Sequence, residues 1–180
     1  MSKDFKSKYD EPLAVRERYA RRNVGDRYSL LRPEVWQGVQ ERQRVMLRLF
    51  ARDLSWQNLT NLKLIEIGCG GGGNLMDFLR FGFLPQNLSG IELLPERAAE
   101  ARRILPVDLV VHAGDANSMD IVPESQDVVF QSVVFSSLLD NGFQHDLANR
   151  MWQWVKPGGG YSGMTLSITT LPIRMCGVFR

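Results

Sequence analysis

Apolar residues recur along this chain with two periods, and from residue 64 onward the two alternate. Spacings of three and four residues predict amphipathic helices, while short apolar runs bounded by turn residues predict buried strands. Two helices come first, and strands and helices then alternate, which predicts a mostly parallel sheet with helices on both faces. The expected helices cover residues 12–22, 33–54, 75–83, 95–105 and 143–154, and the expected strands cover residues 64–67, 88–93, 109–112 and 128–130.

The first expected strand runs into a glycine-rich turn, Leu-Ile-Glu-Ile-Gly-Cys-Gly-Gly-Gly-Gly-Asn, from Leu64 to Asn74. Glycine meets two needs in such a turn. The backbone adopts positive φ angles, and a ligand lies closer to the chain than a Cβ atom would permit. A strand, turn and helix of this kind cradles a phosphate or a nucleoside, and the turn alone does not separate a nicotinamide dinucleotide site from a nucleoside site.

Glu66 favours the nucleoside. It lies inside the strand, two residues before Gly68, and with Gly70 and Gly72 it forms the motif Glu-x-Gly-x-Gly-x-Gly. A carboxylate at this place would repel the pyrophosphate of a dinucleotide, whereas it suits a cationic ligand. S-adenosylmethionine, which carries a sulfonium and an α-ammonium group, is such a ligand.

With this motif the chain resembles the class I S-adenosylmethionine-dependent methyltransferases, over roughly residues 64–160. The resemblance implies methyl transfer from S-adenosyl-L-methionine and a Rossmann-like fold, an α/β doubly wound sheet with strand order 3-2-1-4-5. It also suggests the division of the chain into a helical cap and lid segment (1–62), a cofactor-binding core (63–160) and an atypical tail (161–180).

Polar residues at the ends of later strands extend the expected site. Glu92 ends the second strand, where an acid can accept both ribose hydroxyls; the alternative is a surface carboxylate that caps the next helix. Asp115 follows the third strand, where the resemblance implies adenine recognition; the alternative is an Asx turn. Gln131 ends the fourth strand and is a candidate contact of cofactor or acceptor. The expected cofactor-binding residues are Glu66, Gly68, Cys69, Gly70, Gly72, Glu92, Leu93, Asp115, Ala116 and Gln131.

The sequence identifies no clear catalytic residue. His145, near the start of the last helix, is a weak candidate for a base on the acceptor side, and a surface histidine is the alternative. The two cysteines lack metal-ligand spacing, so we expect no metal, and Cys69 is expected to fill a small space in the glycine turn. Tyr19 and Tyr28 are candidate lid residues, because N-terminal segments of related proteins fold over the cofactor; ordinary packing is the alternative.

Charge and composition bear mainly on partners. The net charge is +2, but residues 1–50 hold 12 basic and 7 acidic residues, while residues 51–180 hold 10 and 13. A basic front end suits an anionic substrate or nucleic acid. Because its basic residues are interleaved with acids, a solvated helical face is favoured and nucleic acid is disfavoured. The polar start and the lack of a long apolar run suggest a cytoplasmic protein without a membrane segment. Because a basic surface that could read nucleic acid is missing, a small-molecule acceptor or sugar precursor is expected.

The resemblance ends at Gly160. Lys156-Pro157-Gly158-Gly159-Gly160 is expected to end the last helix, and residues 161–180 are too few for the remaining strands of a seven-stranded sheet. We therefore expect a chain cut after its fourth strand, with the last strands missing. With suitable synonymous codons, a one-base frame change turns the tail into an apolar strand followed by a loop, which suggests a frameshift.

This truncation leaves two alternatives to an active methyltransferase open. One is a noncatalytic, cofactor-binding remnant, whose exposed sheet edge would allow a homodimer. The other is an NAD-dependent oxidoreductase, which Glu66 disfavours.

Overall fold

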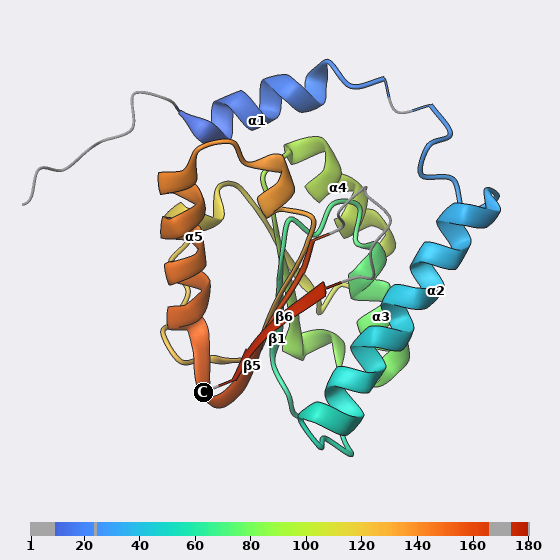
Figure 1. Cartoon of the computed structure of the whole chain (residues 1–180), viewed down its shortest axis with the longest axis vertical. Coiled ribbons are helices and arrows are strands. Elements are labelled where there is room, and N and C mark those ends of the chain that lie inside the picture. The colour runs from blue at the N-terminus through green and yellow to red at the C-terminus, as the bar shows by residue number, and fades with distance from the viewer. Residues whose placement is uncertain (1–9, 24, 166–173, 180) are drawn as a thin grey trace, which may run out of the picture.

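The computed structural model describes residues 10–23, 25–165 and 174–179 of the chain. A sheet occupies the middle of the molecule, and helices cover both of its faces (Figure 1). The strand order is β3-β2-β1-β4-β5-β6. The first five strands are parallel and β6 is antiparallel to β5, which confirms the doubly wound α/β fold and the order 3-2-1-4-5. The strands are β1 (Leu64–Ile67), β2 (Leu88–Glu92), β3 (Val110–Ala113), β4 (Gln126–Ser132), β5 (Val155–Thr165) and β6 (Arg174–Phe179).

All five expected helices form, and local signals set most of their starts. Asp10 accepts a hydrogen bond from the backbone of Leu13 at the start of α1, and Asp140 does the same from Phe143 at the start of α5. Proline occupies the first turn of α1, α2 and α4, where its missing N–H costs nothing. The helices are α1 (Glu11–Ala20), α2 (Pro33–Arg48), α3 (Gly73–Phe81), α4 (Pro95–Ile104) and α5 (Asn141–Trp154).

Alternation along the central strand divides the core in two. Leu64 of β1 packs with residues of α2, α3 and α4, whereas the neighbouring Ile65 packs with residues of α1 and α5. Successive side chains of a strand point to opposite faces, so β1 is buried on both. The first core contains a cluster of aromatic rings from Phe50, Phe78 and Phe130. The two layers of helices thus cover both faces of the sheet and leave the carboxyl ends of its strands to form a site.

The end of the fold corrects two expectations. Helix α5 ends at Trp154 and β5 follows at once, so Lys156-Pro157-Gly158-Gly159-Gly160 does not end the helix. These residues lie within β5, where the pairing with β4 jumps from Gln126–Val155 to Val128–Gly160. They therefore form a β-bulge. The bulge accommodates Gly158, whose φ angle is positive.

The expectation of a chain cut after its fourth strand is wrong, since β5 and β6 continue the sheet. A strand needs only about five or six residues, and pairing with β4 supplies hydrogen bonds to a tail whose composition differs from the rest of the chain. The described residues contain no seventh strand. The frameshift concerns the gene and stays a prediction, as does a homodimer through a sheet edge.

Candidate functional site

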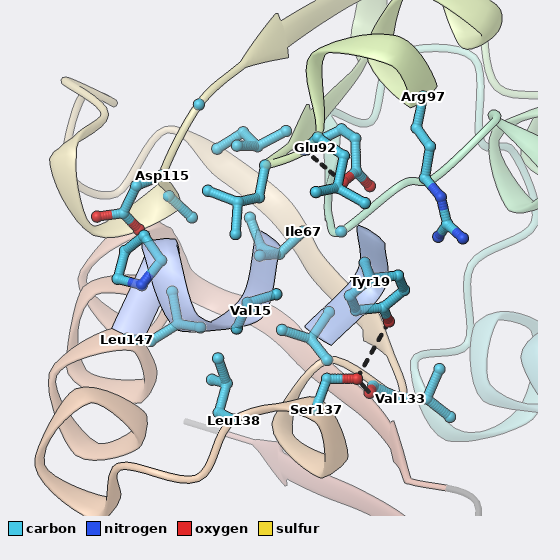
Figure 2. A pocket seen from close by; sticks show the side chains of 18 of the residues that line it. Val15, Tyr19, Ile67, Glu92, Arg97, Asp115, Val133, Ser137, Leu138 and Leu147 are labelled. Carbon is cyan, nitrogen blue, oxygen red and sulfur yellow. Dashed lines mark hydrogen bonds between the residues drawn. The ribbon is translucent and has the colours of Figure 1, made fainter. Parts of the chain in front are cut away.

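A cavity opens at the carboxyl ends of β1, β2, β3 and β4, beneath α1 (Figure 2). Parallel strands end at the same edge of a sheet, and ligands of open α/β sheets bind at the point where the strand order reverses. Here β1 lies between β2 and β4, and residues of both neighbours line the cavity with it. Of the expected cofactor-binding residues, the cavity is lined by Gly68, Glu92, Leu93, Asp115 and Ala116.

The glycine turn has the backbone geometry that its sequence predicts, and it reaches the cavity wall at Gly68. Gly68, Gly70 and Gly72 have φ angles of 67°, 55° and 89°, which residues with a Cβ rarely adopt. A Cβ at Gly68 would lie 2.5 Å from Val134 Cγ2. The backbone N–H groups of Gly68 and Cys69 both donate to the carbonyl of Ile91, at 2.7 and 3.1 Å, so the turn is tied to β2.

Glu92 holds the turn from the other side. One of its oxygens accepts from the N–H of Gly70 at 2.7 Å, and the other accepts from the N–H of Leu94 at 2.9 Å. The side chain is buried at the wall of the cavity, so it is not a surface carboxylate. Each carboxylate oxygen can accept more than one hydrogen bond, so Glu92 can support the turn and still receive ligand hydroxyls.

Glu66 lies behind the turn and does not line the cavity. It is fully buried, and one oxygen accepts from Asn74 Nδ2 of α3 at 2.5 Å. The other oxygen has no hydrogen-bond partner within the described residues. Burial raises the pKa of Glu66 to about 8, against the opposing effects of Asn74 and Arg42. The group is therefore mostly protonated at neutral pH, and the charge argument made from the sequence does not hold for the free protein.

Asp115 forms the Asx turn that the sequence left open, and its predicted contact with adenine stays a prediction. Its oxygens accept from the Asn117 N–H at 3.0 Å and from Ser118 Oγ at 3.1 Å, which is an Asx turn that begins the short 3-10 helix Ala116–Ser118. At the same time its side chain lies at one end of the cavity (Figure 2). An adenine ring at this end would meet a carboxylate that the turn already holds in place.

Gln131 and Cys69 support the site without lining it. Gln131 is buried, and its Oε1 accepts from the backbone N–H of Val134 at 3.0 Å, which shapes the turn after β4. Cys69 packs against Gly90, where an added Cβ would lie 2.7 Å from its sulfur. Burial raises the pKa of the Cys69 thiol, so it is a poor nucleophile.

Two candidates from the sequence lie elsewhere. His145 is exposed on α5 and is absent from the cavity wall, and Tyr28 has 59% of its surface exposed. Tyr19, in contrast, lines the cavity together with Arg97 and Ser137, two residues that the sequence did not single out. Neither residue belongs to a sequence motif. They line the site only because the fold brings them opposite α1 across the cavity. The described residues contain no group of three His, Cys, Asp or Glu side chains suited to a metal ion.

Helix α1 covers the cavity as a lid, and polar contacts fasten it (Figure 2). Tyr19 Oη lies 3.2 Å from Ser137 Oγ. Arg18 donates to Glu11 at 2.6 Å and to the carbonyl of Ser137 at 2.9 Å. The buried carboxylate of Glu11 also accepts from the Leu139 N–H at 2.8 Å. Residues 118 to 128 positions apart in the sequence thus meet at this edge of the site.

Replacing Glu11 by alanine is expected to loosen the lid. The change leaves Arg18 and the Leu139 N–H without their acceptor, and a lost hydrogen bond of this kind costs about 1–3 kcal/mol. Amide hydrogen exchange in α1 should accelerate by about tenfold or more, while the global unfolding midpoint changes little. Glu17→Ala is the matched control, because Glu17 is an exposed residue of the same helix. Equal protection of α1 in the two variants would contradict the fastening role of Glu11.

Comparison with known proteins identifies the family to which this chain belongs. The family described as "Methyltransferase domain" matches residues 64–159, which is just over half of the chain. No curated protein sequence matches this chain. Within the described residues, no helix combines the length and apolar character needed to cross a bilayer.

Solved structures share the fold at low sequence identity. An S-adenosylmethionine-dependent methyltransferase from Mesorhizobium loti has 21% identity and a TM-score of 0.53, over 63% of this chain and 50% of that one. The PH0226 protein from Pyrococcus horikoshii OT3 has 17% identity and a TM-score of 0.61, over 83% and 65%. Haemonchus contortus phosphoethanolamine N-methyltransferase 1, in complex with phosphoethanolamine and S-adenosylhomocysteine, has 13% identity and a TM-score of 0.65, over 86% and 32%. The chain thus spans between about a third and two thirds of the lengths of these proteins.

Proposed function

The chain belongs to the methyltransferase-domain family, and we propose that it binds S-adenosyl-L-methionine beneath α1 and transfers the methyl group to a small-molecule acceptor, such as a sugar precursor. One observation carries the proposal. The carboxylate of Glu92, at the end of β2, is hydrogen-bonded to the glycine turn and lines the same cavity. This arrangement offers acceptor oxygens to ribose beside a backbone that a ligand can approach closely.

The residues of the cavity fit the parts of this cofactor in order. In the proposed complex Asp115 and Ala116 would contact adenine, Glu92 would accept from the ribose hydroxyls, and the backbone of Gly68 would lie beside the ligand at the cavity wall. The bound cofactor would supply a methyl group on a sulfonium, which is already a good leaving group. The protein then has to align donor and acceptor and exclude water, and α1 with its Tyr19–Ser137 contact performs the second task.

Proton transfer is needed only if the acceptor must lose a proton. Besides Glu92, Asp115 and the cationic Arg97, the polar side chains of the cavity wall are the hydroxyls of Tyr19, Ser132 and Ser137, while His145 lies outside it. An acceptor with a free lone pair, such as an amine, would need no stronger base than these. A specific catalytic residue is therefore not assigned.

Calorimetric titration with S-adenosylhomocysteine and with NAD tests the proposal. We expect saturable binding of S-adenosylhomocysteine and none of NAD, because the N–H groups of Gly68, Cys69 and Gly70 already donate within the protein and are not free to bind a pyrophosphate. Absence of S-adenosylhomocysteine binding would overturn the proposal. Binding without methyl transfer to any of a panel of small amines, alcohols and sugar phosphates would instead indicate a noncatalytic cofactor-binding protein.

A further inference from the structure

Two guanidinium groups lie against the ring of Tyr19, which lines the cavity. Arg22 Cζ is 4.3 Å from the ring centroid and Arg97 Cζ is 4.8 Å from it. Both distances are within the range of cation–π contacts, which are stabilising by about 0.5–1 kcal/mol at exposed sites. Figure 2 shows the Arg97 side chain reaching from α4 toward Tyr19 at the end of the cavity opposite Asp115. The Tyr19 ring thus connects Arg22 of the lid segment with Arg97 of the cavity wall.

These two arginines differ from their neighbours in their pairing. Arg18 of α1 has an ion pair with Glu11, and Arg21 has a longer one with Glu17. Among the described residues, neither Arg22 nor Arg97 has a carboxylate within ion-pair distance. Arg97 lines the cavity, whereas Arg22 is exposed beside it and reaches the site through the Tyr19 ring. No carboxylate of the described residues compensates either charge, and the Tyr19 ring orients both guanidinium groups.

A pair of uncompensated guanidinium groups is suited to an anion. The planar fork of arginine matches the geometry of phosphate and carboxylate, and charge-assisted hydrogen bonds of this type are roughly twice as strong as neutral ones. The acidic side chains of the cavity, Glu92 and Asp115, lie toward the parts that would hold ribose and adenine. The cavity is thus acidic where it would hold the nucleoside and basic at Arg97, where α1 meets α4.

We propose that Arg22 and Arg97, held by Tyr19, form a subsite for a phosphate or carboxylate group of the methyl acceptor. The inference rests on the proposed function and narrows it to small anionic acceptors. Because Tyr19 and Arg22 belong to the lid segment, an anion bound to both arginines would also help to hold α1 against α4 and close the cavity.

Anion binding to the protein saturated with S-adenosylhomocysteine tests this subsite. The probes are inorganic phosphate and acetate, each compared with chloride at the same ionic strength, and the readout is the thermal unfolding midpoint. Phosphate or acetate should raise the midpoint of the wild-type protein above the chloride value, and the more effective of the two identifies the anion class. In Arg97→Gln and in Arg22→Gln the apparent affinity for that anion should fall roughly tenfold or more. Arg103→Gln, an exposed site on the same helix, removes the same charge and should behave as wild type.

Three outcomes would overturn the proposal. The first is an equal effect of all three anions on the wild-type protein, and the second is an anion effect that survives in both arginine variants. The third is a loss of S-adenosylhomocysteine affinity of tenfold or more in Arg97→Gln, which would assign the arginines to the carboxylate of the cofactor. If S-adenosylhomocysteine does not bind the wild-type protein, the proposed function fails, and the same anion titration of the ligand-free protein still decides whether the subsite exists.

Discussion

Replacing Glu92 by alanine is expected to weaken S-adenosylhomocysteine binding about a hundredfold or more. The change removes the acceptor of the Gly70 and Leu94 N–H groups, and hydrogen bonds to a charged group contribute about 1.5–3 kcal/mol each. The glycine turn then loses one of its two supports. In the proposed complex the ribose hydroxyls also lose their acceptor. The affinity for S-adenosylhomocysteine therefore falls for two reasons, the loss of a ligand contact and the loss of support for the glycine turn. Calorimetry with S-adenosylhomocysteine measures the effect.

Two further variants separate these causes. Glu92→Gln keeps the shape and one acceptor oxygen, so it should retain part of the affinity and most of the thermal stability. Glu96→Ala, which removes an exposed carboxylate four residues along the chain, should leave binding unchanged. If Glu92→Ala binds S-adenosylhomocysteine as tightly as the wild-type protein, Glu92 has no ribose role.

Replacing Glu66 by glutamine is expected to abolish a large pH dependence of stability. Burial raises the pKa of Glu66 from 4.5 to about 8 in the folded protein. Between these values the folded state binds a proton that the unfolded state has released, so stability falls as pH rises and the loss is complete above about pH 8. One pKa unit corresponds to about 1.4 kcal/mol, so the loss is on the order of several kcal/mol. Glutamine has nearly the same shape and no charge, so the variant should escape this loss.

Urea unfolding at about pH 5, 7 and 9 measures the difference. Glu66→Gln should resemble the wild-type protein at pH 5 and be more stable at pH 9, with an intermediate gain at pH 7. Glu96→Gln, at an exposed position, controls for the loss of a carboxylate in general. Parallel pH profiles of wild type and Glu66→Gln would show that Glu66 ionises normally in the fold.

The glycine turn shows what could be predicted from local sequence. Alternating periods of apolar residues predicted four of the five parallel strands, and short right-handed crossovers predicted the strand order, whereas β5 was not predicted. The positive φ angles of Gly68, Gly70 and Gly72 follow from a turn that glycine alone occupies without strain. The place of Glu92 follows in turn, because a residue that ends the second strand must lie beside the end of the first.

Residues without a motif needed the assembled fold. Arg97 and Ser137 are ordinary residues of a helix and a turn, and they join the site only because α1 packs across the carboxyl edge of the sheet. The bulge in β5 likewise depends on pairing with β4, which turned an expected helix end into part of a strand.

The sequence by itself determined the succession of strands and helices, the glycine turn and the acid that ends β2, because backbone geometry and apolar periodicity are local properties. The tertiary structure alone decided that burial raises the pKa of Glu66, that Tyr19 meets Ser137 across 118 positions, and that two arginines contact its ring. Proton affinity depends on how completely water is excluded, and contacts between distant segments depend on how helices pack, so neither is encoded within a short stretch of the chain.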